Sequence, residues 1–223
     1  MKKMIIIIVV LAGILISMII YKNMAVGSKN NINIQEIKNI EENIEKIYLW
    51  KEVTNEALPN FNSINEADDL WCWEVVKKNI EKFEISYKEI EDVSKEIFGQ
   101  DFDKKFPEEG NGTFEYNEEN GIYIPTEIVL DQMEDNFIIN NIKKINQQYE
   151  VEIIEYLEDY SNEGKVIIRN LQNEEIGRVN ENESETKIHE IVKENGNRFN
   201  KKRVYLNEKN DKLFVEKVEK IQE

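Results

Sequence analysis

The sequence predicts an α+β protein, in which an N-terminal transmembrane helix precedes two to three amphipathic helices packed on a curved, mostly antiparallel sheet. Three observations predict this fold class. Residues 4–21 are an unbroken apolar stretch, residues 34–97 carry apolar side chains at spacings of three and four, and residues 112–215 contain alternating runs separated by turn residues. Helices that come first, followed by strands, indicate an α+β arrangement.

The charge of the chain excludes several classes of protein. Its 223 residues include 29 Lys and Arg against 45 Asp and Glu, which gives a net charge of -16. A nucleic-acid binder needs a concentrated basic surface, and the chain shows no basic stripe, so we expect no nucleic-acid partner. One Cys and one His exclude a disulfide framework, a Cys-rich zinc site and any site that needs two imidazoles.

Residues 1–22 are predicted to form an uncleaved transmembrane signal anchor. The apolar stretch has about 18 residues, close to the roughly 20 that span a bilayer core. Lys2 and Lys3 precede it and place the amino terminus on the cytoplasmic side. We therefore expect a single-pass protein of the cell membrane, with a linker over 23–33 and an extracytoplasmic domain. Residues 28–223 hold 26 basic and 45 acidic side chains, a net charge of -19.

Residues 34–58 are predicted to form a membrane-proximal amphipathic helix. Its apolar stripe consists of Ile37, Ile40, Ile44 and Ile47, with Glu and Lys between them. Two interpretations remain open for this stripe. It packs against the domain of the same chain, or it forms a stalk through which two copies associate, because the same residues fit about two heptads.

The domain over 65–223 is predicted to begin with two further helices. Asn65 and the acids that follow it make an acidic helix start, and apolar residues then recur from Leu70 to Phe83. Ser86 and Glu89 form a capping-box pattern that opens the next helix, which Gly99 ends.

Strands are predicted for most of the remaining chain. Asn120-Gly121 is a hairpin turn within 112–125, and the least certain strands lie over 126–142. A long strand runs from Tyr149 past Tyr156, and a shift in its alternation indicates a bulge. The other expected elements are its antiparallel partner over 165–169, a short helix capped by Ser184, and a terminal hairpin of 203–206 and 213–215 around a five-residue loop.

No catalytic, cofactor-binding or metal-binding residues are predicted. Cys72 is expected to be a core residue and His189 to lie on a helix surface. Glu158 and Asp159 are expected to be solvated charges beside a turn. The aromatic side chains that are expected either in the core or along an apolar ligand groove are Trp71, Trp73, Tyr149 and Tyr156.

Three segments resemble uncharacterised membrane-anchored or secreted clostridial proteins: residues 85–99, residues 149–156, and the pair 201–206 and 213–218. The order of helices, long strand and terminal hairpin is also similar to NTF2-like or cystatin-like domains. This resemblance implies a curved antiparallel sheet wrapped on helices, with a concave pocket. It carries over no catalytic residues.

These observations predict a bacterial envelope protein whose acidic domain is a binding or interaction module and not an enzyme. Its partner would be an envelope protein, a second copy of the chain or a small ligand of unknown identity. One alternative is an envelope hydrolase that uses carboxylates, since 45 acids offer many pairs. Another is a structural or assembly subunit that dimerises through the helix over 34–50.

Overall fold

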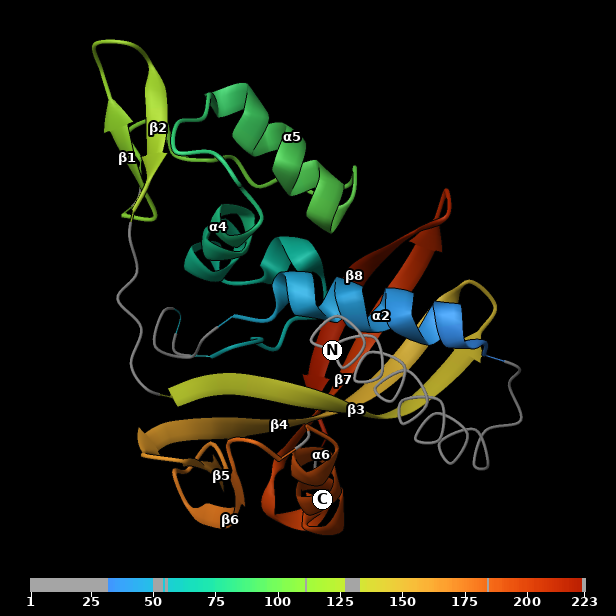
Figure 1. Ribbon diagram of the computed structural model, residues 1–223. Helices are drawn as coiled ribbons and strands as arrows, with labels where there is room; N and C mark the ends of the chain where they lie inside the picture. Colours follow the sequence, from blue (N-terminus) through green and yellow to red (C-terminus); the bar gives the residue numbers. More distant parts are fainter. Residues whose placement is uncertain are drawn as a thin grey trace, which may run out of the picture.

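The computed structural model describes residues 32–49, 54, 56–110, 112–126, 133–183 and 185–221. Of these residues, 39% are in strands and 30% in helices. The α-helices of the described residues are α2 (Ile34–Ile47), α4 (Asp69–Lys78), α5 (Tyr87–Phe98) and α6 (Glu185–Glu194). In Figure 1, α2, α4 and α5 lie on one side of a long pair of strands and α6 lies on the other.

The predicted fold class is wrong in its architecture. The described chain is richer in strand than in helix, its eight strands form two separate sheets, and helices cover both faces of the larger sheet. Among the described residues, no helix is long and apolar enough to cross a membrane. The predicted anchor over 1–22 itself lies outside the described residues.

Helix α2 begins where the sequence predicts and ends earlier. The side chain of Asn33 accepts a hydrogen bond from the backbone of Glu36, whose own side chain accepts one from Asn33. The helix ends at Ile47, not at residue 58, because the ring of Tyr48, its C-cap residue, packs on Phe137 of the sheet with ring centroids 4.9 Å apart. The Tyr48 hydroxyl also donates to the carbonyl of Asn136 at 3.1 Å. These contacts turn the chain onto the sheet.

Helix α4 likewise ends before the predicted boundary. Asp68, and not Asn65, caps it by accepting from the Trp71 amide at 3.0 Å, after a single 3-10 turn over Ile64–Glu66. At the other end the Asn79 side chain donates to the carbonyls of Lys46 and Val75. Phe83, predicted to lie on the apolar face of this helix, is 91% exposed.

Helix α5 carries the predicted capping box, which gives a first testable result. Replacing Ser86 by alanine should lower the free energy of unfolding by about 1 kcal/mol, because the hydroxyl accepts from the Glu89 amide at the helix start. Urea denaturation measures the change. Ser63 occupies the same position before the 3-10 turn but makes no side-chain capping bond, so Ser63→Ala is the matched control and should change stability by less than about 0.5 kcal/mol. An equal loss in both variants would contradict the role of the cap.

The smaller sheet is the predicted hairpin of β1 (Phe114–Asn117) and β2 (Ile122–Pro125). Gly121 lies in its turn at a φ of 68°, a conformation that glycine adopts without steric cost. The larger sheet has the order β6-β5-β4-β7-β8, and β3 also pairs with β4. Its members are β3 (Met133–Ile145), β4 (Gln148–Asn162), β5 (Lys165–Arg169), β6 (Glu175–Asn180), β7 (Asn200–Lys209) and β8 (Lys212–Lys220).

Strand β4 organises the larger sheet. Strand β3 follows one of its edges, while the other edge pairs first with β7 and then, from Leu157 onward, with β5. The bulge predicted where the alternation changes after Ile153 is not in β4, because the register shift at this point lies in β3 between Ile139 and Asn141. The register shift in β4 itself falls later, between Asp159 and Asn162, where the strand pairs with β5. All residues of β4 from Ile153 to Asp159 are buried, so its altered alternation reflects burial on both faces.

The terminal hairpin is longer than predicted. Asn210 and Asp211, both at positive φ, form a two-residue turn, and β7 and β8 extend to either side of it in place of the predicted five-residue loop. Strand β6 was not predicted from the sequence. The predicted helix cap at Ser184 lies outside the described residues.

Two hydrophobic clusters lie on opposite faces of the larger sheet. The first joins α2, α4, α5 and the small sheet to Tyr149, Val151 and Ile153 of β4. The second joins α6 to Ile154 and Tyr156 of the same strand and to β5 and β6. Alternate residues of one strand therefore serve two cores.

Candidate functional site

The aromatic residues singled out in the sequence are all buried, and three of the four lie away from any cleft described below. Trp71 is in the first cluster and Trp73 packs edge-on against Phe106 with ring centroids 5.1 Å apart. The Tyr149 ring is also in the first cluster, and its hydroxyl donates to Glu36 at 3.0 Å. Only Tyr156 of these four borders a cleft.

The Ile stripe of α2 is buried in the core of its own chain. Ile40 and Ile44 are fully buried, and Ile37 and Ile47 are at most 9% exposed. The stripe packs in the first cluster with the sheet and the other helices, and it leaves no apolar face of these residues open to a second copy.

The Cys72 thiol and the His189 imidazole belong to opposite faces of the sheet. Cys72 is buried in the first cluster, where burial raises the pKa of its thiol to about 12, so the thiol is neutral. His189 lies in α6 beside the second cluster. The described residues contain no group of three or more His, Cys, Asp or Glu side chains that could hold a metal ion.

A cleft of about 380 Å³ opens where α6 and β6 approach β3 and the second half of β4. Its apolar lining comes from Phe137, Tyr156, Val166, Val179 and Ile188. Tyr156, Val166, Val179 and Ile188 belong to the second hydrophobic cluster, so the floor of the cleft is a packed part of the fold.

The rim of this cleft is acidic. Six glutamates line it: Glu41 and Glu45 from α2, Glu158 from β4, and Glu181, Glu183 and Glu185 from the start of α6 and the turn before it. No Lys or Arg is among the described residues that line the cleft. Because clefts with low-dielectric walls concentrate the field of their charges, this arrangement attracts cations.

Glu158 is the most buried of these acids. Its carboxylate accepts hydrogen bonds from the hydroxyls of Tyr156 at 3.1 Å and Tyr160 at 2.6 Å. Burial nevertheless raises the pKa of Glu158, and the nearby charges of Glu134 and Glu185 raise it further. The charged form is thus less favoured than in a solvated glutamate, and a cation placed beside the carboxylate would stabilise it.

His189 is the one basic group among the described lining residues. Burial lowers its pKa and Lys193 lowers it further, while Glu185, 3.5 Å away, opposes the shift. The imidazole is therefore neutral at pH 7 and adds no positive charge to the rim, where Lys187 pairs with Glu183.

A second cleft of about 580 Å³ adjoins the first along β3. The two share Glu45, Asn136 and Phe137. The second extends toward Glu134 and Asp135 and toward the end of α2, where Lys46 and Lys78 also line it. The acidic surface thus continues along β3 from one cleft to the other.

This site was not predicted from the sequence. The prediction that Glu158 and Asp159 are solvated charges is wrong, because they are 7% and 4% exposed. Asp159 pairs with Arg169 at 2.8 Å, and Glu158 forms part of the cleft. One sequence pattern could have indicated the site. Tyr156, Glu158 and Tyr160 occupy alternate positions, which places all three side chains on one face of a strand.

We found no match to the chain among protein-family models, curated proteins or solved structures. The resemblance to NTF2-like or cystatin-like domains and to clostridial envelope proteins therefore stays a prediction.

Proposed function

We propose that this chain is a binding module and that the cleft beside α6 receives a cationic group carried on an apolar stem, as in a lysine or arginine side chain of a partner. One observation carries this proposal. The cleft combines six glutamates, an apolar floor and, among its described lining residues, no Lys or Arg. Phe137, Tyr156 and Tyr160 add aromatic rings, which attract cations through their faces.

The two parts of the cleft match the two parts of such a ligand. The apolar floor removes the methylene stem from water, and the rim compensates the charged head. Glu158 lies between them, held in one orientation by two tyrosine hydroxyls. These hydroxyls fix the orientation of the carboxylate and leave acceptor positions on both of its oxygens for a cationic head.

The direct test compares two small ligands that differ in charge alone. These are the acetylated, methylamidated forms of lysine and of norleucine. The chain has a single His, so its imidazole ring protons give unique NMR signals from within the cleft. We expect saturable shifts of the His189 signals with the lysine derivative, at an affinity at least about tenfold above that of norleucine. Equal affinity for the two derivatives would overturn the proposal.

A pair of double variants assigns the affinity to the rim. Glu45→Gln with Glu181→Gln removes two exposed rim charges, and it should weaken lysine binding about fivefold. Glu118→Gln with Glu119→Gln removes two exposed charges at the distant turn of the small sheet and should leave binding unchanged. Equal effects of both double variants would point to the net charge of the protein and not to the cleft.

Binding should weaken in acid. Glu158 has a raised pKa, so it takes up a proton early as the pH falls, and below its lowered pKa His189 gains a positive charge next to Glu185 and Lys193. Both changes make the cleft less negative. The affinity for the lysine derivative, measured by calorimetry from pH 7.5 to 5, should therefore fall, and an affinity that rises over this interval would contradict the assignment.

A further inference from the structure

Strand β3 has a second edge beside the same surface, and no described strand joins it there. It is 13 residues long and pairs with β4 along one edge. No other strand among the described residues pairs with it. An unpaired edge of a strand offers a row of backbone donors and acceptors that an extended chain can join.

The two clefts meet across this edge. Asn136 and Phe137 are neighbours in β3, so their side chains point to opposite faces of the sheet, and both residues line both clefts. The glutamates of α2 lie on the Phe137 side, since the Tyr48 ring at the end of that helix packs on Phe137. The glutamates at the start of α6 lie with the second cluster on the other side. The edge therefore runs between two acidic walls.

The end of α2 is fixed against β3. The Tyr48 hydroxyl donates to the carbonyl of Asn136 and lies 3.5 Å from Glu155, while Lys78 donates to the carbonyls of Tyr48 and Glu45. These bonds hold Glu45, one turn before Tyr48, beside the strand. The acidic wall on this side is thus part of the rigid fold.

We propose that the outer edge of β3, around Asn136 and Phe137, binds an extended basic peptide segment of a partner protein as an additional strand. This inference rests on the proposed function and specifies its ligand. Side chains of an added strand alternate between the two faces of the sheet, so consecutive basic residues would reach the α2 wall and the α6 wall in turn. The backbone supplies affinity, and the two walls supply the preference for Lys and Arg.

Charge favours a basic partner over a second copy of this chain. The lining of the two clefts contains Glu41, Glu42, Glu45, Glu134, Asp135, Glu158, Glu181, Glu183 and Glu185, against Lys46 and Lys78. Pairing β3 with β3 of another copy would bring these acids together, and like charges across an interface oppose association.

The test uses the full chain and the acetylated, amidated octapeptide Lys-Lys-Val-Lys-Lys-Val-Lys-Lys. The control peptide has the same sequence but is N-methylated at alternate residues. It keeps every charge but cannot form the backbone hydrogen bonds of an added strand. We expect the unmethylated peptide to bind at least about tenfold more tightly than the methylated one. Its free backbone amides can form several hydrogen bonds that N-methylation prevents. It should also slow hydrogen exchange at the amides of β3 that point away from β4.

If the two peptides bound equally, β3 gained no protection and the lysine derivative still bound in the cleft, strand addition alone would be overturned. If the lysine derivative also failed to bind, the proposed function itself would be refuted. Sedimentation tests whether a second copy occupies the edge. If the free protein sedimented as a dimer and the peptide did not dissociate it, the inference would also be overturned. The Glu45→Gln, Glu181→Gln double variant should bind the peptide about fivefold more weakly, with Glu118→Gln, Glu119→Gln as the unchanged control.

Discussion

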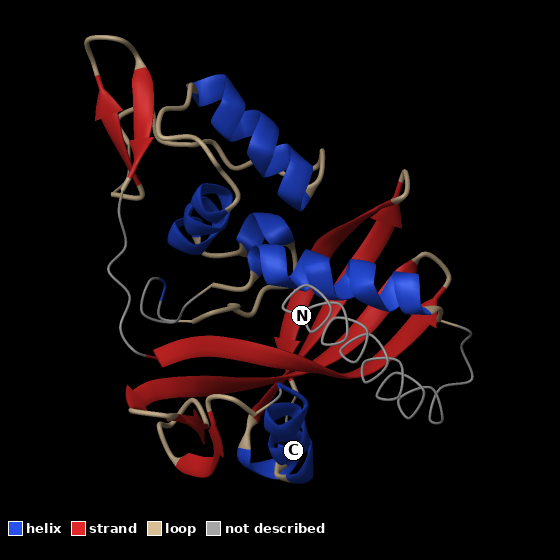
Figure 2. Ribbon diagram, in the orientation of Figure 1, coloured by secondary structure: helices blue, strands red, loops and turns tan. Residues whose placement is uncertain are grey.

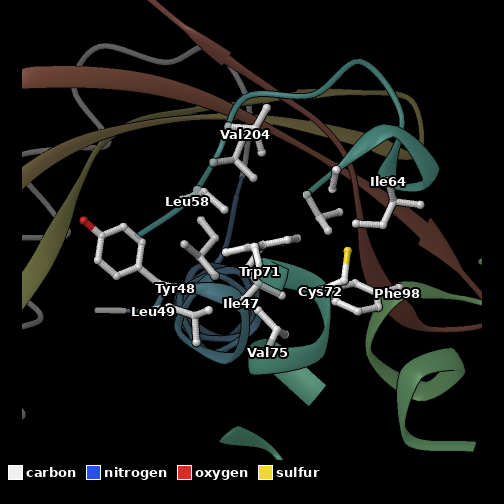
Figure 3. Packing of buried hydrophobic residues seen from close by; sticks show 14 of the residues in the cluster. Ile47, Tyr48, Leu49, Leu58, Ile64, Trp71, Cys72, Val75, Phe98 and Val204 are labelled. Atoms are coloured by element: carbon white, nitrogen blue, oxygen red, sulfur yellow. The ribbon is translucent and has the colours of Figure 1, made fainter. Parts of the chain in front are cut away.

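Replacing Trp71 by alanine is expected to lower the free energy of unfolding by about 3–5 kcal/mol. The side chain is fully buried and lies among Ile47, Leu58 and Val75 in Figure 3. Its ring also packs against Phe98 with centroids 5.9 Å apart, and its indole N–H donates to the carbonyl of Ala57 at 3.2 Å. The substitution would therefore leave a large cavity in the core that joins the helices to the sheet, and would remove one of the two hydrogen bonds that the Ala57 carbonyl accepts, the other being donated by the Leu49 amide.

Urea denaturation followed by circular dichroism measures this loss. Phe83→Ala is the control of the same kind, because Phe83 is 91% exposed, and it should change the stability by less than about 0.5 kcal/mol. A loss below about 1 kcal/mol for Trp71→Ala would show that this side chain does not organise the core.

Replacing Glu155 by glutamine is expected to remove a strong pH dependence of stability. Glu155 is 1% exposed at the centre of β4, where Lys202 lies 3.5 Å from one carboxylate oxygen. The other oxygen has no hydrogen-bond partner among the described residues. Burial raises the pKa of Glu155 to about 7, with Glu56 and Asp135 acting in the same direction and Lys202 opposing it.

The sign follows from the raised pKa. Below pH 4.5 the carboxyl is protonated in both the folded and the unfolded chain, whereas between pH 4.5 and 7 the unfolded chain loses its proton first. The contribution of Glu155 to stability is therefore complete in acid and is lost as the pH rises through about 7. Relative to Glu155→Gln, the wild-type protein should lose about 3 kcal/mol over this interval, as urea denaturation at pH 4.5 and 7.5 would show. The exposed Glu118→Gln should show no such trend, and a constant difference for Glu155→Gln would refute the assignment.

Local parts of the fold were predictable from the sequence because neighbouring residues determine them. The capping box of Ser86 and Glu89 and the turn at Gly121 need contacts within four residues of the chain. The end of α2 was not predictable in this way. It depends on Tyr48 meeting Asn136 and Phe137, almost ninety residues further along the chain.

The cleft could not be predicted either, because it depends on contacts between segments far apart in the sequence. Glu41 and Glu45 lie in one amphipathic helix and Glu181, Glu183 and Glu185 in a distant turn and helix, and in the sequence each group resembles an ordinary solvated surface. The pairing of β3 with β4 and the docking of α6 bring them together. Net charge alone, at -16, predicted acidity but not where that acidity would be concentrated.

The pKa of His189 is the most direct measure of whether a cation occupies this cleft. An NMR titration of its ring protons should give a pKa below the ordinary 6.5 in the free protein. With a saturating concentration of the lysine derivative the pKa should fall further, because a second positive charge beside the imidazole disfavours its protonation. An unchanged or higher pKa in the complex would show that the cation binds elsewhere and would contradict the cleft as the binding site.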